Sequence, residues 1–464
     1  MNARGSGRKP APRKRPNAGD GHRRSTDARS ASSRTRNTPS RTSSTRNPRG
    51  TRSVPSRNTP SRNAQRRRGP RRSSKTSFPL SFPSFLASST RGRRILIGVI
   101  AFAVFLLTLS LVFCGHGTKT QDESHARGSY SVSFTTTGDL IFWREVADYI
   151  DMNGGASAMA NIDDMLAQAD VTISNVESPL SDNESAPIAN KDIYIIGRPS
   201  AIEGIRNSGI DIVSLANNHI MDYTGPALQD TLNALDGAGV LHAGAGMTEE
   251  EAGKPVETTV NGVSVAFFSW TDIIPENYLA FGDQPGVVSA RMNLDDACRR
   301  VREAKETHDI VIVAMHWGVQ YQDRINDSLQ REPAHKLVDA GADVIVGNHP
   351  HVLQGIEFYN GSLIAYAHGN CVFRQAHEFG HTHESYVLNF DITDSGIQNV
   401  VATPLYLDDA YGIPSIATGE QAQTTLNRLV EVSEGMNTSF ELRDDKAYIS
   451  PQTRRSGSGD GAGG

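Results

Sequence analysis

The chain has 464 residues and a formal net charge of −4 at pH 7, and it contains three cysteines. The low net charge is misleading, because residues 1–94 hold 26 basic and 2 acidic residues (+24), while the rest of the chain holds 21 basic and 49 acidic residues (−28). Three cysteines exclude a disulfide-stapled scaffold and leave open only a Cys298–Cys371 bond in an exported domain.

Residues 1–94 are rich in Arg, Ser, Thr, Pro and Asn, and they are almost free of apolar residues before Phe78. Such a segment buries too little apolar surface to offset the entropy of ordering its backbone, so we expect it to be disordered. A basic tail of this kind binds anionic lipid headgroups, with about 1 kcal/mol per basic residue near the surface, or it binds nucleic acid without sequence preference. The apolar segment that follows favours lipid, and nucleic acid is the less favoured partner.

A run of nineteen uncharged residues, 95–113, follows the tail. About twenty apolar residues in a helix span the hydrocarbon core of a bilayer. Arg91, Arg93 and Arg94 flank this run on its N-terminal side only, which predicts a cytoplasmic N-terminus. The run lies too far along the chain for a cleaved signal peptide, and the bulky residues before Cys114 do not fit a lipoprotein cleavage site. We expect a single-pass signal anchor in the cell membrane, with the main domain extracytoplasmic.

After a linker over 114–129, short runs rich in Val and Ile alternate with helical patterns, which predicts an α/β domain over 130–402. The runs expected as strands are Ser131–Thr136, Val171–Ser174, Ile210–Leu215, Val263–Ser269, Ile310–Met315 and Val344–Val346, and the helical segments include 225–239 and 329–340. Residues 403–450 are less periodic and are expected to pack as a small C-terminal addition. A disordered Gly/Ser tail over 451–464 is expected to follow.

Polar residues of metal-ligand or acid–base type follow five of these expected strands. They are Asp139, then Glu177, then Asn217, Asn218, His219 and Asp222, then His316, and finally His349 and His351. Ligands bind beyond the carboxyl ends of strands in open α/β sheets, so we expect these groups to converge on one site. Each group also has a purely structural interpretation as a helix cap, a turn residue or a core histidine. Five such strand ends together favour a site.

Carboxylates, amide oxygens and several imidazoles suit one or two divalent ions such as Mn²⁺, Fe²⁺ or Zn²⁺ better than Ca²⁺, which prefers an all-oxygen shell. A pair of ions about 3.5–4 Å apart would polarise a phosphoryl oxygen and activate a water molecule for in-line attack. His219 is placed to protonate the leaving oxygen, and we assign Asp222 a catalytic role together with His219.

At these residues the chain resembles the capsule-synthesis CapA family, the poly-γ-glutamate synthesis proteins whose domain is similar to calcineurin-like metallophosphoesterases. The resemblance runs from about Val132 to Phe373, and its motifs are GDLIFWR, NVESPL, SLANNHIMDYTGPALQDTLNALDGAGVLHAGAG, AMHWGVQY, DAGADVIVGNHPHV and AHGNCVF. It implies a metallophosphatase-like fold of two packed mixed β-sheets flanked by helices. It also implies a role in capsule or poly-γ-glutamate synthesis or export, with capsular or envelope polymer and a capsule-synthesis membrane complex as partners.

The resemblance further implies roles for individual residues. A metal-binding carboxylate, a bridging carboxylate and a metal-binding amide match Asp139, Glu177 and Asn218, the catalytic imidazole matches His219, and the imidazole ligands match His316, His349 and His351. Substrate contacts are assigned to Arg144, Asn217 and Asn370. The chain departs from the phosphoesterase pattern at Ile141, where an Asp-x-His motif would supply a further ligand.

Three further histidines, His377, His381 and His383, follow no apolar strand and are interpreted as a loop over the site rather than as primary ligands. Two functions of different class remain. One is a metal-dependent phosphoesterase-like hydrolase of an envelope polymer or its precursor, which the Asn218–His219 pair favours. The other is a non-catalytic polymer- or partner-binding component of a capsule-assembly complex, which the missing ligand at position 141 favours.

Overall fold

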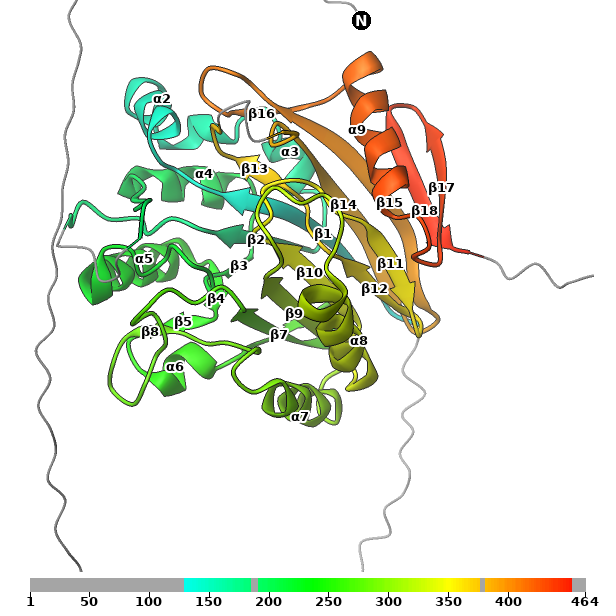
Figure 1. Ribbon diagram of the computed structural model, residues 1–464, viewed down its shortest axis with the longest axis horizontal. Coiled ribbons are helices and arrows are strands. Elements are labelled where there is room, and N and C mark those ends of the chain that lie inside the picture. Colours follow the sequence, from blue (N-terminus) through cyan, green and yellow to red (C-terminus); the bar gives the residue numbers. More distant parts are fainter. Residues whose placement is uncertain (1–128, 185–190, 376–379, 453–464) are drawn as a thin grey trace, which may run out of the picture. The chain divides into compact units, whose positions relative to one another are not determined.

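Two mixed β-sheets packed face to face form the centre of the computed structural model (Figure 1). The structure describes residues 129–184, 191–375 and 380–452. The predicted basic tail, the predicted membrane anchor at 95–113 and residues 453–464 lie outside these ranges. Within them, no helix is both long enough and apolar enough to cross a membrane.

In the described part of the chain, the larger sheet has ten strands, and its strands β1 to β4 are parallel. The main strand order is β17 (Thr438–Arg443), β18 (Lys446–Pro451), β15 (Gly396–Leu407), β14 (Glu384–Thr393), β1 (Ser131–Leu140), β2 (Val171–Val176), β3 (Ile212–Ser214) and β4 (Leu241–Ala243). Two short strands complete it: β13 (Asn370–Val372) pairs with β1, and β16 (Pro414–Ile416) pairs with β15.

The second sheet has six strands among the described residues, and its four central strands are parallel. The order is β11 (Ile356–Tyr359), β12 (Ser362–Ala365), β10 (Val344–Asn348), β9 (Ile310–His316), β7 (Val263–Thr271) and β6 (Val256–Val260). Every residue of β9 is buried, as expected for a parallel strand that is covered on both faces. A separate ribbon joins β5 (Ala245–Gly246) to β8 (Gly286–Val287).

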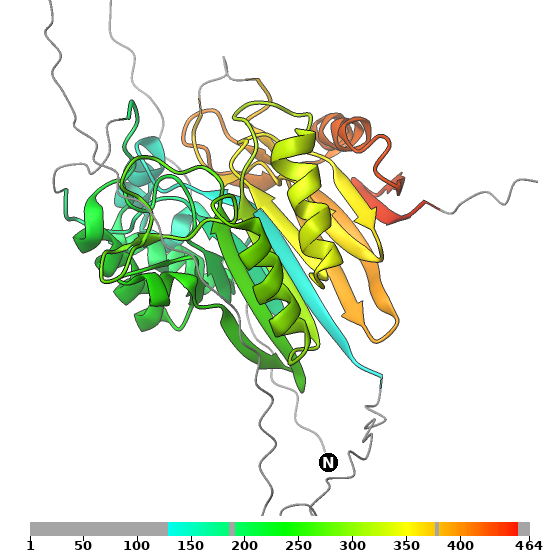
Figure 2. The ribbon, with the colours of Figure 1, turned by 60° about the horizontal axis from the view of Figure 1, so that its bottom comes forward.

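Helices cover the outer faces of both sheets, and Figure 2 shows α7 and α8 over the six-stranded sheet. The helices are α2 (Glu145–Asn153), α3 (Asp163–Leu166), α4 (Ile202–Asn207), α5 (Thr224–Ala238), α6 (Glu249–Gly253), α7 (Leu294–Lys305), α8 (Glu332–Asp339) and α9 (Gly419–Val432). Short helical turns are η1 (Gly155–Ala158), η2 (Pro199–Ala201) and the π-helical η3 (Asp327–Arg331).

Three apolar cores hold these layers together. The first lies between the sheets and stacks Phe134 on Phe390 with 5.6 Å between ring centroids. The second packs α2 to α5 against the ten-stranded sheet, and the third packs α7 and α8 against the six-stranded sheet. In α5 the buried face carries Leu228, Leu232 and Leu235, and Gly239 ends the helix with a φ of 77°. The expected α/β class and the two packed sheets flanked by helices are therefore confirmed.

The segment after residue 402 continues the larger sheet. β15 (Gly396–Leu407) crosses the domain boundary that was expected between residues 402 and 403. β17 and β18 extend the same sheet beside it. Leu426, Leu429 and Val432 of α9 belong to the core between the sheets. The two described cysteines, Cys298 in α7 and Cys371 in β13, are both buried free thiols, so the bond that the sequence left open does not form in this structure.

Candidate metal centre

The acid and imidazole side chains that follow the strands come together at one end of the two sheets. Asp139 lies at the end of β1 and Glu177 directly after β2, while His316 ends β9 and the His349–His351 turn follows β10. These strands are parallel neighbours within their sheets, so their carboxyl ends point the same way. Glu177 belongs to two groups of potential ligand atoms. Within each group, all the atoms lie within 4.8 Å of one another.

The first group contains Glu177, His316 and His349. His316 Nε2 lies 3.4 Å from Glu177 Oε1, 3.2 Å from His349 Nδ1 and 2.7 Å from Asn218 Oδ1. One ring nitrogen thus faces a carboxylate oxygen, a second imidazole nitrogen and an amide oxygen. We call this set of four side chains the histidine-rich position.

The second group contains Asp139, Glu177 and His351. His351 Nδ1 lies 3.5 Å from Asp139 Oδ2, and His351 Nε2 lies 4.0 Å from Glu177 Oε1. Asn175 donates to Asp139 Oδ1 at 2.7 Å, and the backbone N–H of His349 donates to Asp139 Oδ2 at 3.3 Å. We call this second set the carboxylate-rich position.

The chemistry of the donor set fits a divalent cation. Glu177 is fully buried, and neither of its oxygens accepts a hydrogen bond from the described residues. Burial raises the pKa of Glu177 well above its usual range, and the nearby Asp139 raises it further. Burial would lower the pKa of His351, but the carboxylates of Glu177 and Asp139 outweigh it and raise this pKa to about 9. Both of these raised pKa values indicate a buried pocket that attracts positive charge.

The other two imidazoles of the cluster favour the neutral form that binds metals. Burial lowers the pKa of His316 to about 3, and burial together with the neighbouring His316 and His351 lowers the pKa of His349 well below its usual range. A neutral imidazole offers a lone pair to a metal ion. The turn that carries His349 and His351 is strained, because these residues have φ of 100° and 59° on either side of Pro350. Strain of this kind is concentrated at functional sites.

A buried network surrounds His219 next to the two positions. Asp222 Oδ2 accepts from His219 Nδ1 at 2.8 Å, and Tyr278 donates its hydroxyl to Asp222 Oδ1. Lys191 Nζ lies 2.5 Å from Asp222 Oδ1 and 3.1 Å from His219 Nδ1, and it donates to the Asn218 carbonyl at 2.6 Å. Burial lowers the pKa of His219 to about 4. The sequence did not single out Lys191 or Tyr278, because neither follows a strand or belongs to a recognisable motif.

A cavity of about 120 Å³ opens beside the cluster and is lined by His219 and His351 together with Arg144, Trp143 and Tyr321, among others. The Arg144 guanidinium stacks 3.7 Å from the centre of the Trp143 ring, and the Arg144 side chain is exposed at the mouth. Arg144 has a φ of 52°, an unusual conformation for a residue with a side chain.

Two of the residues assigned to substrate contacts are hydrogen-bonded within the protein. The Asn217 amide donates to the Val176 carbonyl at 2.8 Å and accepts from the backbone N–H groups of His219 and Ile220, so it holds the turn that carries His219. Asn370 is fully buried against His351, with 2.9 Å between Oδ1 and the ring Nδ1.

The loop that contains His377, His381 and His383 lies partly outside the described residues, which do not include His377. His381 is about half exposed and lies 3.5 Å from Glu384. His383 is buried, and its ring nitrogens lie 3.0 Å from the Leu407 carbonyl and 3.1 Å from the Gln375 carbonyl. Neither of these two described histidines belongs to the ligand groups.

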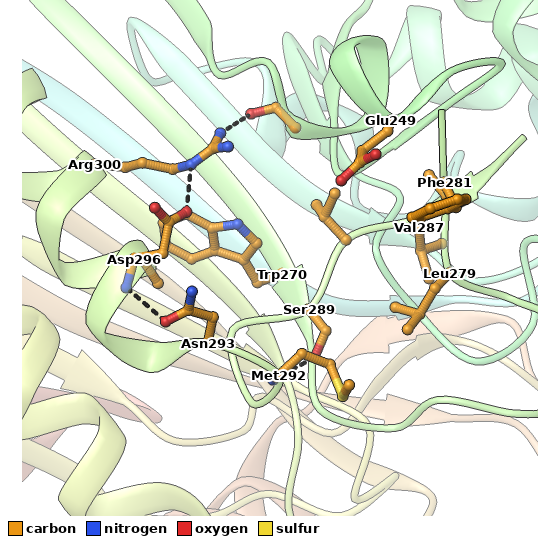
Figure 3. Close-up of a pocket in the computed structure, with 14 residues that line it drawn as sticks. Glu249, Trp270, Leu279, Phe281, Val287, Ser289, Met292, Asn293, Asp296 and Arg300 are labelled. Atoms are coloured by element: carbon orange, nitrogen blue, oxygen red, sulfur yellow. Dashed lines mark hydrogen bonds and ion pairs between the residues drawn. The ribbon is translucent and has the colours of Figure 1, made fainter. Parts of the chain in front are cut away.

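A larger cavity, of about 410 Å³, lies near α7 and the β7 end and is shown in Figure 3. Polar groups that line it are paired within the protein: Arg300 donates to Asp296 at 2.9 Å and to the Gly253 carbonyl at 3.0 Å, and Asn293 caps α7. The ligand-type residues of the cluster do not line it, so the smaller cavity beside His351 is the better candidate for chemistry.

Residues 133–375 match the family described as "Bacterial capsule synthesis protein PGA_cap". The chain belongs to this family. Relatives of this capsule synthesis protein include the PGA biosynthesis protein CapA of Bacillus subtilis, 30% identical over 74% of this chain and 88% of the relative. The capsule biosynthesis protein CapA of Bacillus anthracis is also 30% identical, over 70% of this chain and 78% of the relative. Among solved structures, the calcineurin-like phosphoesterase YfkN of Bacillus subtilis aligns with a TM-score of 0.31 and 16% identity, over 66% of this chain and 99% of that one.

The matched residues 133–375 contain the whole cluster, from Asp139 to His351. The predicted family and the resemblance that carried it are therefore confirmed, and buried Asp, Glu and His groups that could hold a divalent metal are present.

Proposed function

We propose that this capsule synthesis protein acts in capsule or poly-γ-glutamate synthesis or export as a metal-dependent phosphoesterase-like hydrolase, which cleaves a phosphoester in an envelope polymer or in its lipid-linked precursor. The observation that carries the proposal is the fully buried Glu177 carboxylate, which has no hydrogen-bond partner among the described residues and is shared by two groups of Asp and His ligand atoms. Such a donor set suits one or two ions of Mn²⁺, Fe²⁺ or Zn²⁺.

The ions that these residues would hold supply Lewis acidity toward a phosphoryl oxygen and lower the pKa of a water molecule. Asp222 fixes the His219 ring through Nδ1, so Nε2 remains for the substrate. A proton that Nε2 takes up from solvent would give an imidazolium that Asp222 stabilises, and this proton would then pass to the leaving oxygen. The exposed Arg144 guanidinium at the mouth would bind an anionic group of the substrate.

We also propose that residues 95–113 anchor the chain in the cell membrane, with the basic tail against anionic lipid and the metal centre on the extracytoplasmic side. This placement would put the centre beside envelope polymer and beside a membrane complex for capsule synthesis. The single-sided flank of Arg91, Arg93 and Arg94 supports this orientation.

A non-catalytic polymer-binding component is the second candidate, and Ile141 favours it. Ile141 is fully buried with Ile195 and Phe373, so the position where a phosphoesterase has a further ligand offers no donor atom here. Weaker binding of one metal ion would reduce turnover, while the other ion and Arg144 would still present positive charge to an anionic polymer.

The first test is the metal content of the full-length chain, purified in detergent, by mass spectrometry. We expect one or two equivalents of Mn, Fe or Zn, lost in His349→Ala and retained in the control variant His242→Ala, whose histidine lies outside the cluster. Hydrolysis of bis(p-nitrophenyl) phosphate should then fall about 100-fold or more in His219→Ala with its metal retained. Bound metal without any turnover would support the polymer-binding role, and a folded chain that binds no metal would refute the hydrolase and leave polymer binding as the function.

A further inference from the structure

The carboxylate-rich position contains three charged or imidazole ligands, and the sequence offers no fourth one at position 141. Ile141 packs in an apolar cluster with Ile195, Phe373 and the partly buried Trp143. A catalytic metal site with three protein ligands usually leaves an open coordination position, but Glu177 is shared here with the histidine-rich position. Another neutral donor close to Asp139 and His351 would compensate for the missing ligand.

Asn370 lies where such a donor is needed. In the β1–β13 ladder its Cα pairs directly with that of Asp139, so the two side chains start from neighbouring points on adjacent strands. Asn370 is fully buried, and its Oδ1 lies 2.9 Å from His351 Nδ1, the same nitrogen that lies 3.5 Å from Asp139 Oδ2. His351 Nδ1 therefore lies within 3.5 Å of an oxygen atom from each of two other potential ligands.

The orientation of the Asn370 amide is fixed by its nitrogen. Nδ2 lies 3.1 Å from the Thr382 carbonyl, 3.3 Å from the His351 carbonyl and 3.4 Å from Gln375 Oε1. Turning the amide over would place its oxygen against backbone carbonyl oxygens that have no proton to donate. Oδ1 therefore faces His351, and this oxygen is the atom presented to the carboxylate-rich position.

The distances match the spacing of ligands around one ion. Two donor atoms that each lie about 2.1 Å from a metal are about 3.0 Å apart at a right angle and about 3.4 Å apart at the tetrahedral angle. The separations at His351 Nδ1 are 2.9 Å to Asn370 Oδ1 and 3.5 Å to Asp139 Oδ2. The histidine-rich position contains a similar amide–imidazole pair, with 2.7 Å between Asn218 Oδ1 and His316 Nε2.

We propose that Asn370 Oδ1 is a direct ligand of the ion held by Asp139, Glu177 and His351, in place of the ligand that Ile141 cannot supply. The inference rests on the metal centre of the proposed function. Two carboxylates, one amide oxygen and one imidazole make this position richer in oxygen than its neighbour. Oxygen ligands suit Mn²⁺, whereas the two imidazoles of the histidine-rich position suit Zn²⁺ or Fe²⁺ as well.

The test measures Mn²⁺ binding to the full-length chain by calorimetry, with Asn370→Ala compared against Asn389→Ala. Asn389 is a matched control, because its amide bonds to Thr135 on β1 four residues before Asp139. We expect two Mn²⁺ ions on the wild type and on Asn389→Ala. On Asn370→Ala one ion should bind unchanged and the other at least about 10-fold more weakly. Equal affinities in all three proteins would overturn the inference while leaving the metal centre intact, whereas no Mn²⁺ on the wild type would overturn both.

A crystal structure of the Mn²⁺-loaded protein distinguishes a ligand from a residue that only orients His351, and it decides the question even if the alanine variant fails to fold. A bond of about 2.2 Å between Mn²⁺ and Asn370 Oδ1 is expected. An ion bound to His351 Nε2, with His351 Nδ1 donating a proton to Asn370 Oδ1, would overturn the inference.

Discussion

Glu177 illustrates at the scale of one residue how a candidate metal ligand opposes stability. Its carboxylate is fully buried, and neither oxygen accepts a hydrogen bond from the described residues. The protein therefore carries a group whose charged form burial disfavours. His351 and Lys191 offset part of this cost, and a bound cation would offset more of it. Residues of this kind exchange stability for function.

Glu177→Gln should separate these two effects. The amide removes the bridging charge, so we expect the affinity for Mn²⁺ to fall about 100-fold or more. Because the folded-state pKa of Glu177 lies well above the usual range, the wild type loses stability as pH rises from the ordinary pKa of 4.5 toward the raised one. In chelator, the variant should therefore melt at a higher temperature than the wild type at pH 8 and at an equal temperature near pH 4. A lower melting temperature at pH 8 would contradict this account.

At the scale of elements, close backbone contacts hold the strand ends that carry the ligands. A Cβ added to Gly347 in β10 would lie 1.9 Å from the Tyr366 carbonyl oxygen and 2.8 Å from Trp317 Nε1. The same Trp317 nitrogen donates to Tyr366 at 2.9 Å. The sequence before the His349 turn therefore requires a residue without a side chain.

Gly347→Ala should lower the free energy of unfolding by about 1–3 kcal/mol, because the neighbouring segment has to move. Urea unfolding followed by circular dichroism measures the change. Gly237→Ala in α5 is the matched control: its added Cβ would meet no atom within 4 Å, and alanine favours a helix over glycine by about 0.5–1 kcal/mol. Equal behaviour of the two variants would show that β10 tolerates displacement.

Asp170 links the two sheets at the end of the molecule that lies opposite to the carboxyl ends of β1 and β2. Its Oδ2 accepts from the backbone N–H and the hydroxyl of Ser133 in β1, at 2.9 and 2.7 Å, and its Oδ1 accepts from Asn261 in the β6–β7 turn at 3.0 Å. The bonds from Ser133 hold the pKa of Asp170 below its ordinary value of 3.8. The stability that they contribute is present above this ordinary pKa and is lost as pH falls through the lowered one.

Asp170→Asn should therefore reduce stability at pH 7 by about 0.5–1 kcal/mol, a small effect because the carboxylate is exposed. Below about pH 3 the difference between variant and wild type should shrink, since the wild-type carboxylate then becomes protonated. Urea unfolding at both pH values checks this. A difference that stays constant with pH would assign the effect to packing.

At the scale of the whole molecule, the candidate metal centre lies between the two sheets. Asp139 lies in β1 of the ten-stranded sheet and Glu177 directly follows β2, whereas His316, His349 and His351 belong to strands or turns of the six-stranded sheet. A cation between them would hold the sheets together at the end where the core is polar. Ligand binding of this kind stabilises only the folded state.

Divalent metal should raise the melting temperature of the wild type. At a free concentration of 100 times Kd the stabilisation is about 2.7 kcal/mol, which corresponds to on the order of 5 °C for a domain of this size. His349→Ala should lose most of this shift, and His242→Ala should keep it. Scanning calorimetry with Mn²⁺ and with excess chelator provides the measurement.

Much of the fold could be predicted because strands and helices leave local patterns. The expected run Val263–Ser269 is β7 (Val263–Thr271), and the expected helix 225–239 is α5 (Thr224–Ala238). The strands after residue 380 were not predicted, since β15 mixes exposed and buried residues without a clear period and β17 has only exposed and partly buried residues. Their place in the larger sheet comes from pairing with β14 and β18.

The sequence by itself determined the α/β class, the family, and the acid and imidazole residues that follow the strands, because strand periodicity and short motifs are local properties. Only the tertiary structure decided which of these residues meet. It set Asn370 beside Asp139 through the β1–β13 register, and it brought Lys191 and Tyr278 onto Asp222. Contacts between residues so far apart in the chain depend on strand order and loop path, and no local pattern encodes these.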